Sequence, residues 1–193
     1  AEAYTIDQSL RFNGADNSEL TRSPGTPTST QIGTVSVWTK SDVGINADWA
    51  GIISNYSDND NRIYLAIGND TLANQNLIVY GKVGGSANVY LRSDMRIRDP
   101  AAWYHLVMAY DTTQVTAANR IRLYVNNVEL TDFSIETYPD QNAIMRFNGE
   151  PNLQVGRRYA GGSLGTYGGY LAEFNFIDGQ QLTPSSFGET DTA

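Results

Sequence analysis

The sequence predicts an all-β domain in which two antiparallel sheets pack face to face. Apolar and polar residues alternate with a period of two in segment after segment, clusters of Gly, Asn and Asp separate the segments, and helix signals are scarce. The chain has 193 residues, a length that sandwiches reach without splitting. We therefore expect residues 1–193 to form a single domain, with residues 1–5 as a flexible N-terminal extension.

The clearest strand is the segment 120–125. Its alternation directs Ile121, Leu123 and Val125 to the core, while Arg120, Arg122 and Tyr124 point away from it. The dipeptide Asn126-Asn127 then turns the chain into residues 128–130, which predicts a β-hairpin.

The remaining strands follow the same alternation, and together they predict about ten to fourteen strands. In the segment 34–40, Val35 and Val37 share one face while Ser36 and Trp38 share the other. The other expected strands cover residues 62–67, 77–80, 88–91, 104–110, 153–156 and 170–177. One helical turn is expected over residues 182–188, with Thr183 as the cap and Pro184 at its first position. A second short turn is expected over residues 99–102.

Composition excludes several classes of function. The formal net charge is −8, and a nucleic-acid partner would need a basic face. No cysteine is present, which removes thiolate catalysis and thiolate metal sites. No apolar run approaches the ~20 residues that cross a bilayer, so we expect a soluble domain without membrane insertion.

Several blocks of the sequence resemble a known family. The block 103–111 (WYHLVMAYD) and the block 122–126 (RLYVN) resemble the laminin-G-like pattern, in which a Trp-His strand leads to a hairpin ending in LYVNG. Residues 9–13, the strand through Trp38 and residues 170–179 fit the pattern too. The resemblance implies a two-sheet jelly roll of the concanavalin A-like, laminin-G-like kind. Asn127 stands where the family usually carries Gly, and Asn tolerates positive φ nearly as well.

The C-terminal segment 178–190 (DGQQLTPSSFGET) resembles a subgroup found in structural proteins of tailed bacteriophages. That resemblance implies a non-enzymatic module of a virion, either a capsid decoration or a tail appendage, with lectin-like carbohydrate binding. Its expected partners are a glycan or a virion protein surface, with homo-oligomers as a further expectation, and its expected location is the virion surface or the extracellular space. A decoration protein without any ligand is an alternative.

Aromatic residues supply candidates for contacts with sugars, because Tyr and Trp combine an apolar ring with a polar atom. With 12 Tyr in the chain, some must belong to the core or its rim. The candidate carbohydrate-binding residues are Trp49, Tyr56, Tyr64, Tyr80, Tyr90, Tyr159 and Tyr167.

The segment 58–61 offers a candidate calcium site. Asp58, Asp60 and Asn61 place oxygen-bearing side chains in one loop, and Ca²⁺ prefers such ligands. Asn and Asp also occur in turns because they bond their own backbone, so an ordinary turn is the alternative. No other cofactor is expected.

A polysaccharide lyase acting on an acidic glycan is the alternative enzymatic hypothesis. Such a lyase needs a cation to neutralise a uronate and a Tyr or His to take the proton. His105 (the only histidine), Tyr124, Arg122 and Arg120 would supply that set, whereas a solvated outer face and a structural His105 would explain the same residues. Residues 170–172 lack the Tyr-x-Lys pattern of alginate-lyase-like relatives. A glycoside hydrolase is disfavoured because Glu173 and Asp178 fall on opposite faces of a regular strand.

Overall fold

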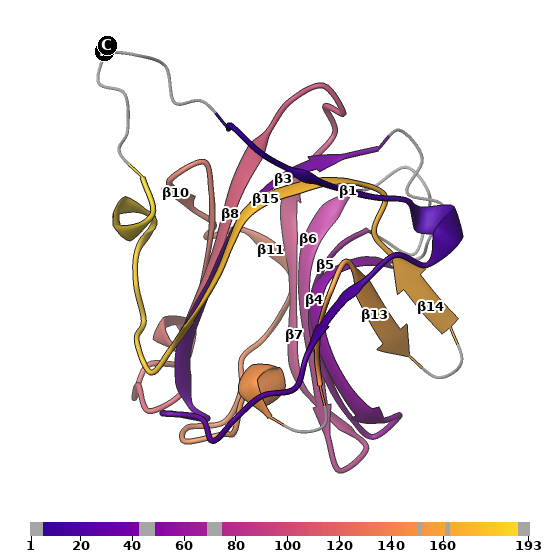
Figure 1. Ribbon diagram of the computed structural model, residues 1–193. Coiled ribbons are helices and arrows are strands. Elements are labelled where there is room, and N and C mark those ends of the chain that lie inside the picture. The colour runs from indigo at the N-terminus through magenta and orange to yellow at the C-terminus, as the bar shows by residue number, and fades with distance from the viewer. Residues whose placement is uncertain (1–5, 43–48, 69–74, 150–151, 161–162, 189–193) are drawn as a thin grey trace.

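A computed structural model describes residues 6–42, 49–68, 75–149, 152–160 and 163–188 of the chain. Two antiparallel sheets face each other and enclose the core between them (Figure 1). The all-β sandwich predicted from the alternation is therefore confirmed. The expected N-terminal extension, residues 1–5, lies outside the described residues.

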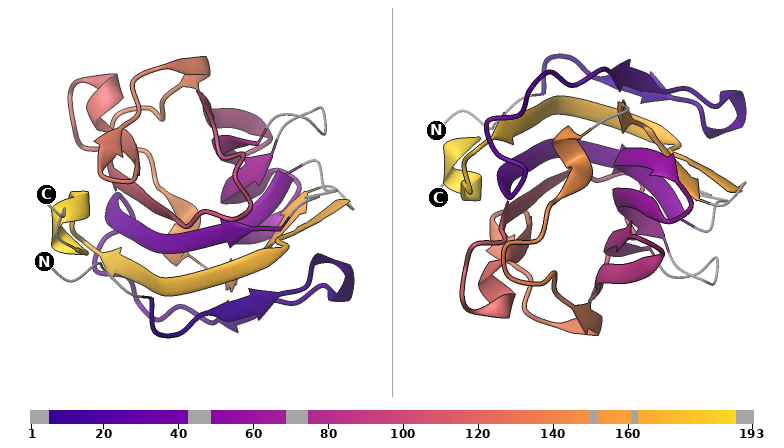
Figure 2. Two further views of the ribbon diagram at one scale, coloured as in Figure 1. Left: turned by 90° about the horizontal axis from the view of Figure 1, so that it is seen from above. Right: turned by 90° about the horizontal axis from the view of Figure 1, so that it is seen from below.

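The first sheet has six strands. Strand β15 lies between β1 and β3, and β3 in turn pairs with β8, so that the two ends of the chain build one half of this sheet (Figure 2). In spatial order the strands are β1 (Leu10–Phe12), β15 (Gly169–Asp178), β3 (Ile32–Ser41), β8 (Tyr104–Asp111), β9 (Ile121–Val125) and β10 (Val128–Glu129).

The second sheet has seven strands, and its four central strands β7, β6, β5 and β4 follow one another along the chain in reverse spatial order. In spatial order the strands are β11 (Phe133–Thr137), β7 (Ser86–Arg96), β6 (Asn76–Val83), β5 (Asn61–Gly68), β4 (Trp49–Asp58), β12 (Leu153–Val155) and β2 (Leu20–Arg22). A separate hairpin is formed by β13 (Arg157–Ala160) and β14 (Ser163–Thr166).

Helical structure in the described residues is limited to four 3₁₀ turns: η1 (Gly14–Asp16), η2 (Ala117–Asn119), η3 (Arg146–Asn148) and η4 (Pro184–Ser186). None of these is long and apolar enough to cross a membrane. The turn η4 confirms the helical turn expected near Pro184. Thr183 does not cap it through its side chain, because its hydroxyl pairs with the Ser185 hydroxyl instead.

The core is built by the inward residues of both sheets, as the alternation predicts. Val35 and Val37 of β3 are fully buried, and Ile121 and Leu123 of β9 join the same cluster. The seven-stranded sheet contributes further aliphatic side chains: Ile53, Ile63, Leu65, Ile67, Leu77, Val79, Val89 and Leu91. Burial of these apolar side chains is the main force that holds the two sheets together.

The hairpin between β9 and β10 turns as the sequence predicts. Asn126 and Asn127 have φ values of 49° and 66°, the left-handed pair that a two-residue hairpin turn requires. Asn127 therefore fills the position where the family usually carries Gly. Asn126 also accepts a hydrogen bond from the backbone N–H of His105, which ties the turn to β8.

Candidate functional site

Four aromatic rings gather on the outer face of the seven-stranded sheet, the face turned away from the core. Tyr64, Tyr80 and Tyr90 occupy paired positions on β5, β6 and β7, and neighbouring rings are 5.4 Å apart between centroids. The indole of Trp49 lies 5.7 Å from each of the three. We call these residues the aromatic cluster. Tyr64 is its buried floor, while the other three rings are half-buried.

Two arginines contact the aromatic cluster. Arg158 is only 4% exposed, and its guanidinium lies 5.4 Å from the Trp49 ring centroid and 5.3 Å from that of Tyr64. Its Nε donates a hydrogen bond of 2.7 Å to the Trp49 backbone carbonyl. Arg62 lies over Tyr80 at 5.8 Å. Burial raises the pKa of the Tyr64 phenol well above its usual range, so Tyr64 stays neutral beside these cations.

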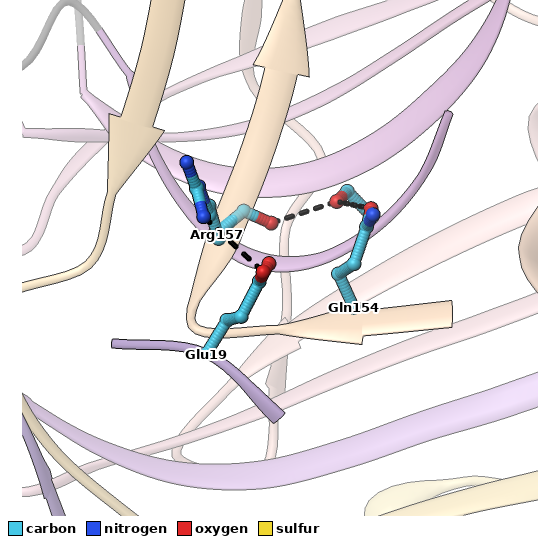
Figure 3. Close-up of polar contacts among 4 residues, drawn as sticks. Glu19, Gln154 and Arg157 are labelled. Carbon is cyan, nitrogen blue, oxygen red and sulfur yellow. Dashed lines mark hydrogen bonds and ion pairs between the residues drawn. The ribbon is translucent and has the colours of Figure 1, made fainter. Parts of the chain in front are cut away.

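The hairpin β13–β14 brings Arg158 to this face by lying across β4. The approach is close because Gly51 has no side chain: a Cβ there would be 2.5 Å from the backbone of Arg157 and Arg158. Ser54 of β4 donates hydrogen bonds to the Arg157 carbonyl (2.7 Å) and to Gln154 Oε1 (3.0 Å), and Glu19 accepts one from Arg157 at 3.1 Å (Figure 3). These contacts fix the hairpin on the sheet.

A second aromatic pair flanks the cluster on the same side of the sheet. The rings of Tyr56 on β4 and Tyr159 on β13 are 5.6 Å apart, and the Arg157 guanidinium lies 4.6 Å from the Tyr159 ring centroid. Aromatic faces, phenol hydroxyls and guanidinium groups thus lie together on one surface of a chain whose net charge is −8. Such a surface can stack on the apolar face of a ring and bond its polar substituents.

A laminin G family profile, described as the concanavalin A-like lectin/glucanases superfamily, matches residues 13–186. The chain belongs to this superfamily. No curated protein matches the sequence.

Solved structures show the same fold at low sequence identity. A heptameric SAP-like pentraxin from Limulus polyphemus has a TM-score of 0.60 at 19% identity, over 95% of this chain and 82% of the pentraxin chain. The CBM40 of a Ruminococcus gnavus IT-sialidase, bound to α2,3-sialyllactose, has a TM-score of 0.57 at 15% identity, over 87% of this chain and 92% of that chain. Tailspike protein 2 of an Escherichia coli O157:H7 bacteriophage has a TM-score of 0.59 at 15% identity, over 89% of this chain but 23% of the tailspike chain.

The structure brings most of the aromatic candidates to the outer side of the seven-stranded sheet. Trp49, Tyr64, Tyr80 and Tyr90 form the cluster, and Tyr56 and Tyr159 form the adjacent pair. Tyr167 is an exception: it is fully buried, packs edge-on against Phe12, and its hydroxyl bonds Thr39. A ring enclosed by the core cannot stack on a ligand, so Tyr167 does not belong to the candidate surface.

The cationic residues of this surface were not among the candidates chosen from the sequence. Arg62, Arg157 and Arg158 acquire their positions from strand pairing and from the hairpin, which the alternation does not describe. The run Arg157-Arg158-Tyr159 was the available signal, since cations and an aromatic ring adjoin there in an otherwise acidic chain.

The lyase candidates lie on or next to the six-stranded sheet and do not form an open site. The His105 imidazole is buried, stacks on Trp38 at 4.9 Å and bonds Ser36 Oγ at 2.9 Å. Phe187, which follows η4, lies 6.5 Å from the imidazole and packs against the cluster formed by Val107, Ala109 and Tyr124. Tyr124 points away from the main core, as the alternation predicts, but the C-terminal segment covers this face, so the solvated outer face given as the alternative to the lyase is not found around His105 and Tyr124.

The two arginines of the proposed lyase set serve local structure. Arg120 was expected to share the outer strand face with Arg122, but it ends η2 with a helical backbone and is not part of β9. Its side chain donates hydrogen bonds to the carbonyls of Gln114, Val115 and Pro139. Arg122 bonds Asn119 at 2.8 Å and lies 3.7 Å from a Glu129 carboxylate oxygen. A uronate would find neither guanidinium beside His105.

The prediction that Glu173 and Asp178 fall on opposite faces of a strand assumes that the strand is regular, and β15 is not regular. Its register shifts between Ala172 and Asn175, and Glu173 has a φ of 48°. The odd separation of the two residues in the sequence therefore does not decide which face of the sheet each one occupies. Asp178 instead anchors a loop by accepting hydrogen bonds from the backbone N–H groups of Thr28 and Ser29.

The candidate calcium ligands form the turn between β4 and β5. Asp58 accepts hydrogen bonds from the Asp60 N–H (2.8 Å) and from the Asn61 side-chain amide (3.0 Å), and these donors hold the pKa of its carboxyl below the usual value. The described residues contain no group of three or more His, Cys, Asp or Glu side chains placed to hold a metal ion. These hydrogen bonds are those of an ordinary turn, the alternative given for this segment, and the calcium site at Asp58, Asp60 and Asn61 stays a prediction.

The close approach of the hairpin to β4 predicts the effect of Gly51→Ala. The added methyl group would meet the backbone of the hairpin and push it off the sheet, at a cost of about 1–3 kcal/mol of unfolding free energy. Urea denaturation measures that loss. The control is Gly25→Ala, since a Cβ at Gly25 has nothing within 4 Å. Equal stability of the two variants would contradict the proposed packing.

Burial of the single imidazole predicts a pH dependence of stability. Desolvation lowers the pKa of His105 below its usual 6.5, with a nearby Glu173 opposing the shift. The folded state thus disfavours the proton that the unfolded chain binds, so stability is full above about pH 6.5 and declines as the pH falls below it. NMR titration should place the His105 midpoint below 6.5, and His105→Gln should remove the decline between about pH 6.5 and 5. A midpoint above 6.5 would contradict this account.

Proposed function

We propose that this domain is a non-enzymatic carbohydrate-binding module that uses the aromatic cluster as its binding surface. A sugar ring would stack on the half-buried faces of Trp49, Tyr80 and Tyr90, while guanidinium N–H groups and phenol hydroxyls would bond its substituents. Tyr64 is buried and would contribute by packing against Trp49 and Tyr80. The observation that carries the proposal is that four aromatic rings gather on one sheet face and are contacted there by two arginines.

Two comparisons support this choice of ligand. The CBM40 that shares the fold is bound to a sialylated sugar, and the superfamily description itself names lectins and glucanases. The contrast between the two sheets of this chain adds a physical reason. The outer face around His105 is occupied by Phe187, whereas the aromatic cluster keeps partly accessible rings.

The biological setting that we propose is a bacteriophage virion, with the domain exposed on a capsid or on a tail appendage. The C-terminal segment 178–190 resembles phage structural proteins, and a phage tailspike shares the fold. Repetition of the domain on a particle would raise the avidity of a weak glycan site by orders of magnitude. A homo-oligomer would have the same effect.

Truncation of the central ring tests the binding surface. Trp49→Ala should weaken binding to any glycan retained on an array by about 30-fold, because central aromatic anchors contribute about 2 kcal/mol or more. The backbone carbonyl that holds Arg158 remains in this variant, so the hairpin should stay in place. Titration calorimetry measures the affinity, and thermal unfolding confirms that the variant is folded.

The matched control is Trp103→Ala. Trp103 is also half-buried, but it pairs with Tyr170 on the other sheet at 6.5 Å. Its loss should leave affinity within about twofold of the unsubstituted domain. If both variants lose binding equally, or if a dense array retains no protein at all, the proposed surface is wrong.

A further inference from the structure

A cavity lies outside the aromatic cluster, at the end of the sandwich where β5, β6 and β7 meet the loop before η3. Its volume is about 230 Å³. We call it the end cavity. Its lining comes from two groups of residues far apart in the sequence: Arg62, Ile63, Gly81, Lys82, Val83, Asn88 and Val89 from the strands, and Pro139, Asp140, Ala143, Ile144, Met145 and Arg146 from the loop.

Three cations from three different elements line the end cavity. Arg62 of β5 and Lys82 of β6 stand directly opposite each other in the sheet, and Arg146 begins η3. Asp140 is the one carboxylate among the lining residues, so the lining carries an excess of positive charge even though Asp58 lies near Arg146 outside it. A local excess of positive charge in a chain of net charge −8 attracts an anion.

The guanidinium groups of the end cavity retain unused hydrogen-bonding capacity. The Nε atoms of Arg62 and Arg146 are buried and have no acceptor within the described part of the chain. Asp58, whose carboxylate lies near enough to Arg146 to feel its charge, already accepts hydrogen bonds from Asp60 and Asn61. Buried donors without acceptors are unfavourable, and a bound anion beside these guanidinium groups would offset that cost through its charge, although the Nε atoms themselves lie out of its reach.

The rest of the lining is apolar. Ile63, Val89 and Met145 are buried there, while Val83 and Ile144 remain 42% and 60% exposed. Two exposed aliphatic side chains beside a cationic rim offer a place for a short hydrocarbon group as well as for its charge. The volume is below the ~300 Å³ at which sites for drug-sized ligands begin, which limits the occupant to a small molecule or a single terminal group.

We propose that the end cavity binds a small amphipathic carboxylate. The carboxylate would lie between Arg62, Lys82 and Arg146, and the short apolar body would contact Val89, Met145 and Ile144. Arg62 is shared with the aromatic cluster, where it lies over Tyr80, but the other lining residues take no part in that cluster. Substitutions at Arg146 and Ala143 therefore test this site alone, and the Trp49 variant tests the glycan surface alone.

Methyl NMR spectra test the proposal, with hexanoate as the probe and hexan-1-ol as its uncharged counterpart. Hexanoate should produce saturable shifts confined to the methyl groups of Ile63, Val83, Val89, Ile144 and Met145, with an affinity at least about fivefold above that of hexan-1-ol. No saturable shift up to about 20 mM hexanoate, or equal binding of the alcohol, would overturn the proposal.

Arg146→Gln tests the role of a lining cation and Ala143→Leu tests the open volume of the end cavity, with Arg96→Gln as the control. Arg146→Gln should weaken hexanoate binding by about fivefold or more, whereas Arg96→Gln, which removes an exposed cation from the end of β7, should leave it unchanged. Ala143→Leu should abolish binding by filling the cavity. Arg146 takes no part in the aromatic cluster, so glycan binding should survive its loss. Equal effects of Arg146→Gln and Arg96→Gln would overturn the proposed site.

Discussion

The buried guanidinium of Arg158 connects the parts of the candidate surface. It reaches the Trp49 carbonyl and lies against the rings of Trp49 and Tyr64, although only 4% of its surface is exposed. A buried cation is costly unless its N–H groups and its charge are satisfied, so its contacts constrain every element around it. The hairpin β13–β14 must lie on β4, and β4 must offer a glycine at the crossing. The hydrogen bond from Arg158 to the Trp49 carbonyl joins the hairpin to the first residue of β4.

The fold was predictable where the alternation is regular. Val35, Val37, Ile121 and Leu123 pointed inward on a simple period of two, and the structure places all four in the core. Strand β4 was not predicted, because its pairing with β5 shifts between Gly51 and Ile53 and its alternation is broken there. Short strands such as β13 and β14 carry too few residues for a period to be recognised.

The sequence predicted aromatic residues of the candidate surface but not their arrangement in space. The sequence identified Trp49, Tyr64 and Tyr80 as rings that suit a sugar, but it gave Tyr167 the same standing. Tertiary structure separates Tyr64 from Tyr167. Tyr64 pairs with Tyr80 on an outer face of the sheet, whereas Tyr167 follows β14 and lies in the core. The role of Arg158 also depends on a contact across more than a hundred residues, between β13 and Trp49. Local patterns contain no information about such contacts.

The central claim is that ligands meet this domain on the aromatic face of the seven-stranded sheet. The chain has three tryptophans, Trp38, Trp49 and Trp103, so its indole N–H signals form a small set of NMR reporters. Titration with a glycan retained on an array should shift the Trp49 indole signal and saturate, while the signals of Trp38 and Trp103 on the other side stay in place. A saturable shift of Trp38 or Trp103 with an unmoved Trp49 signal would contradict the account.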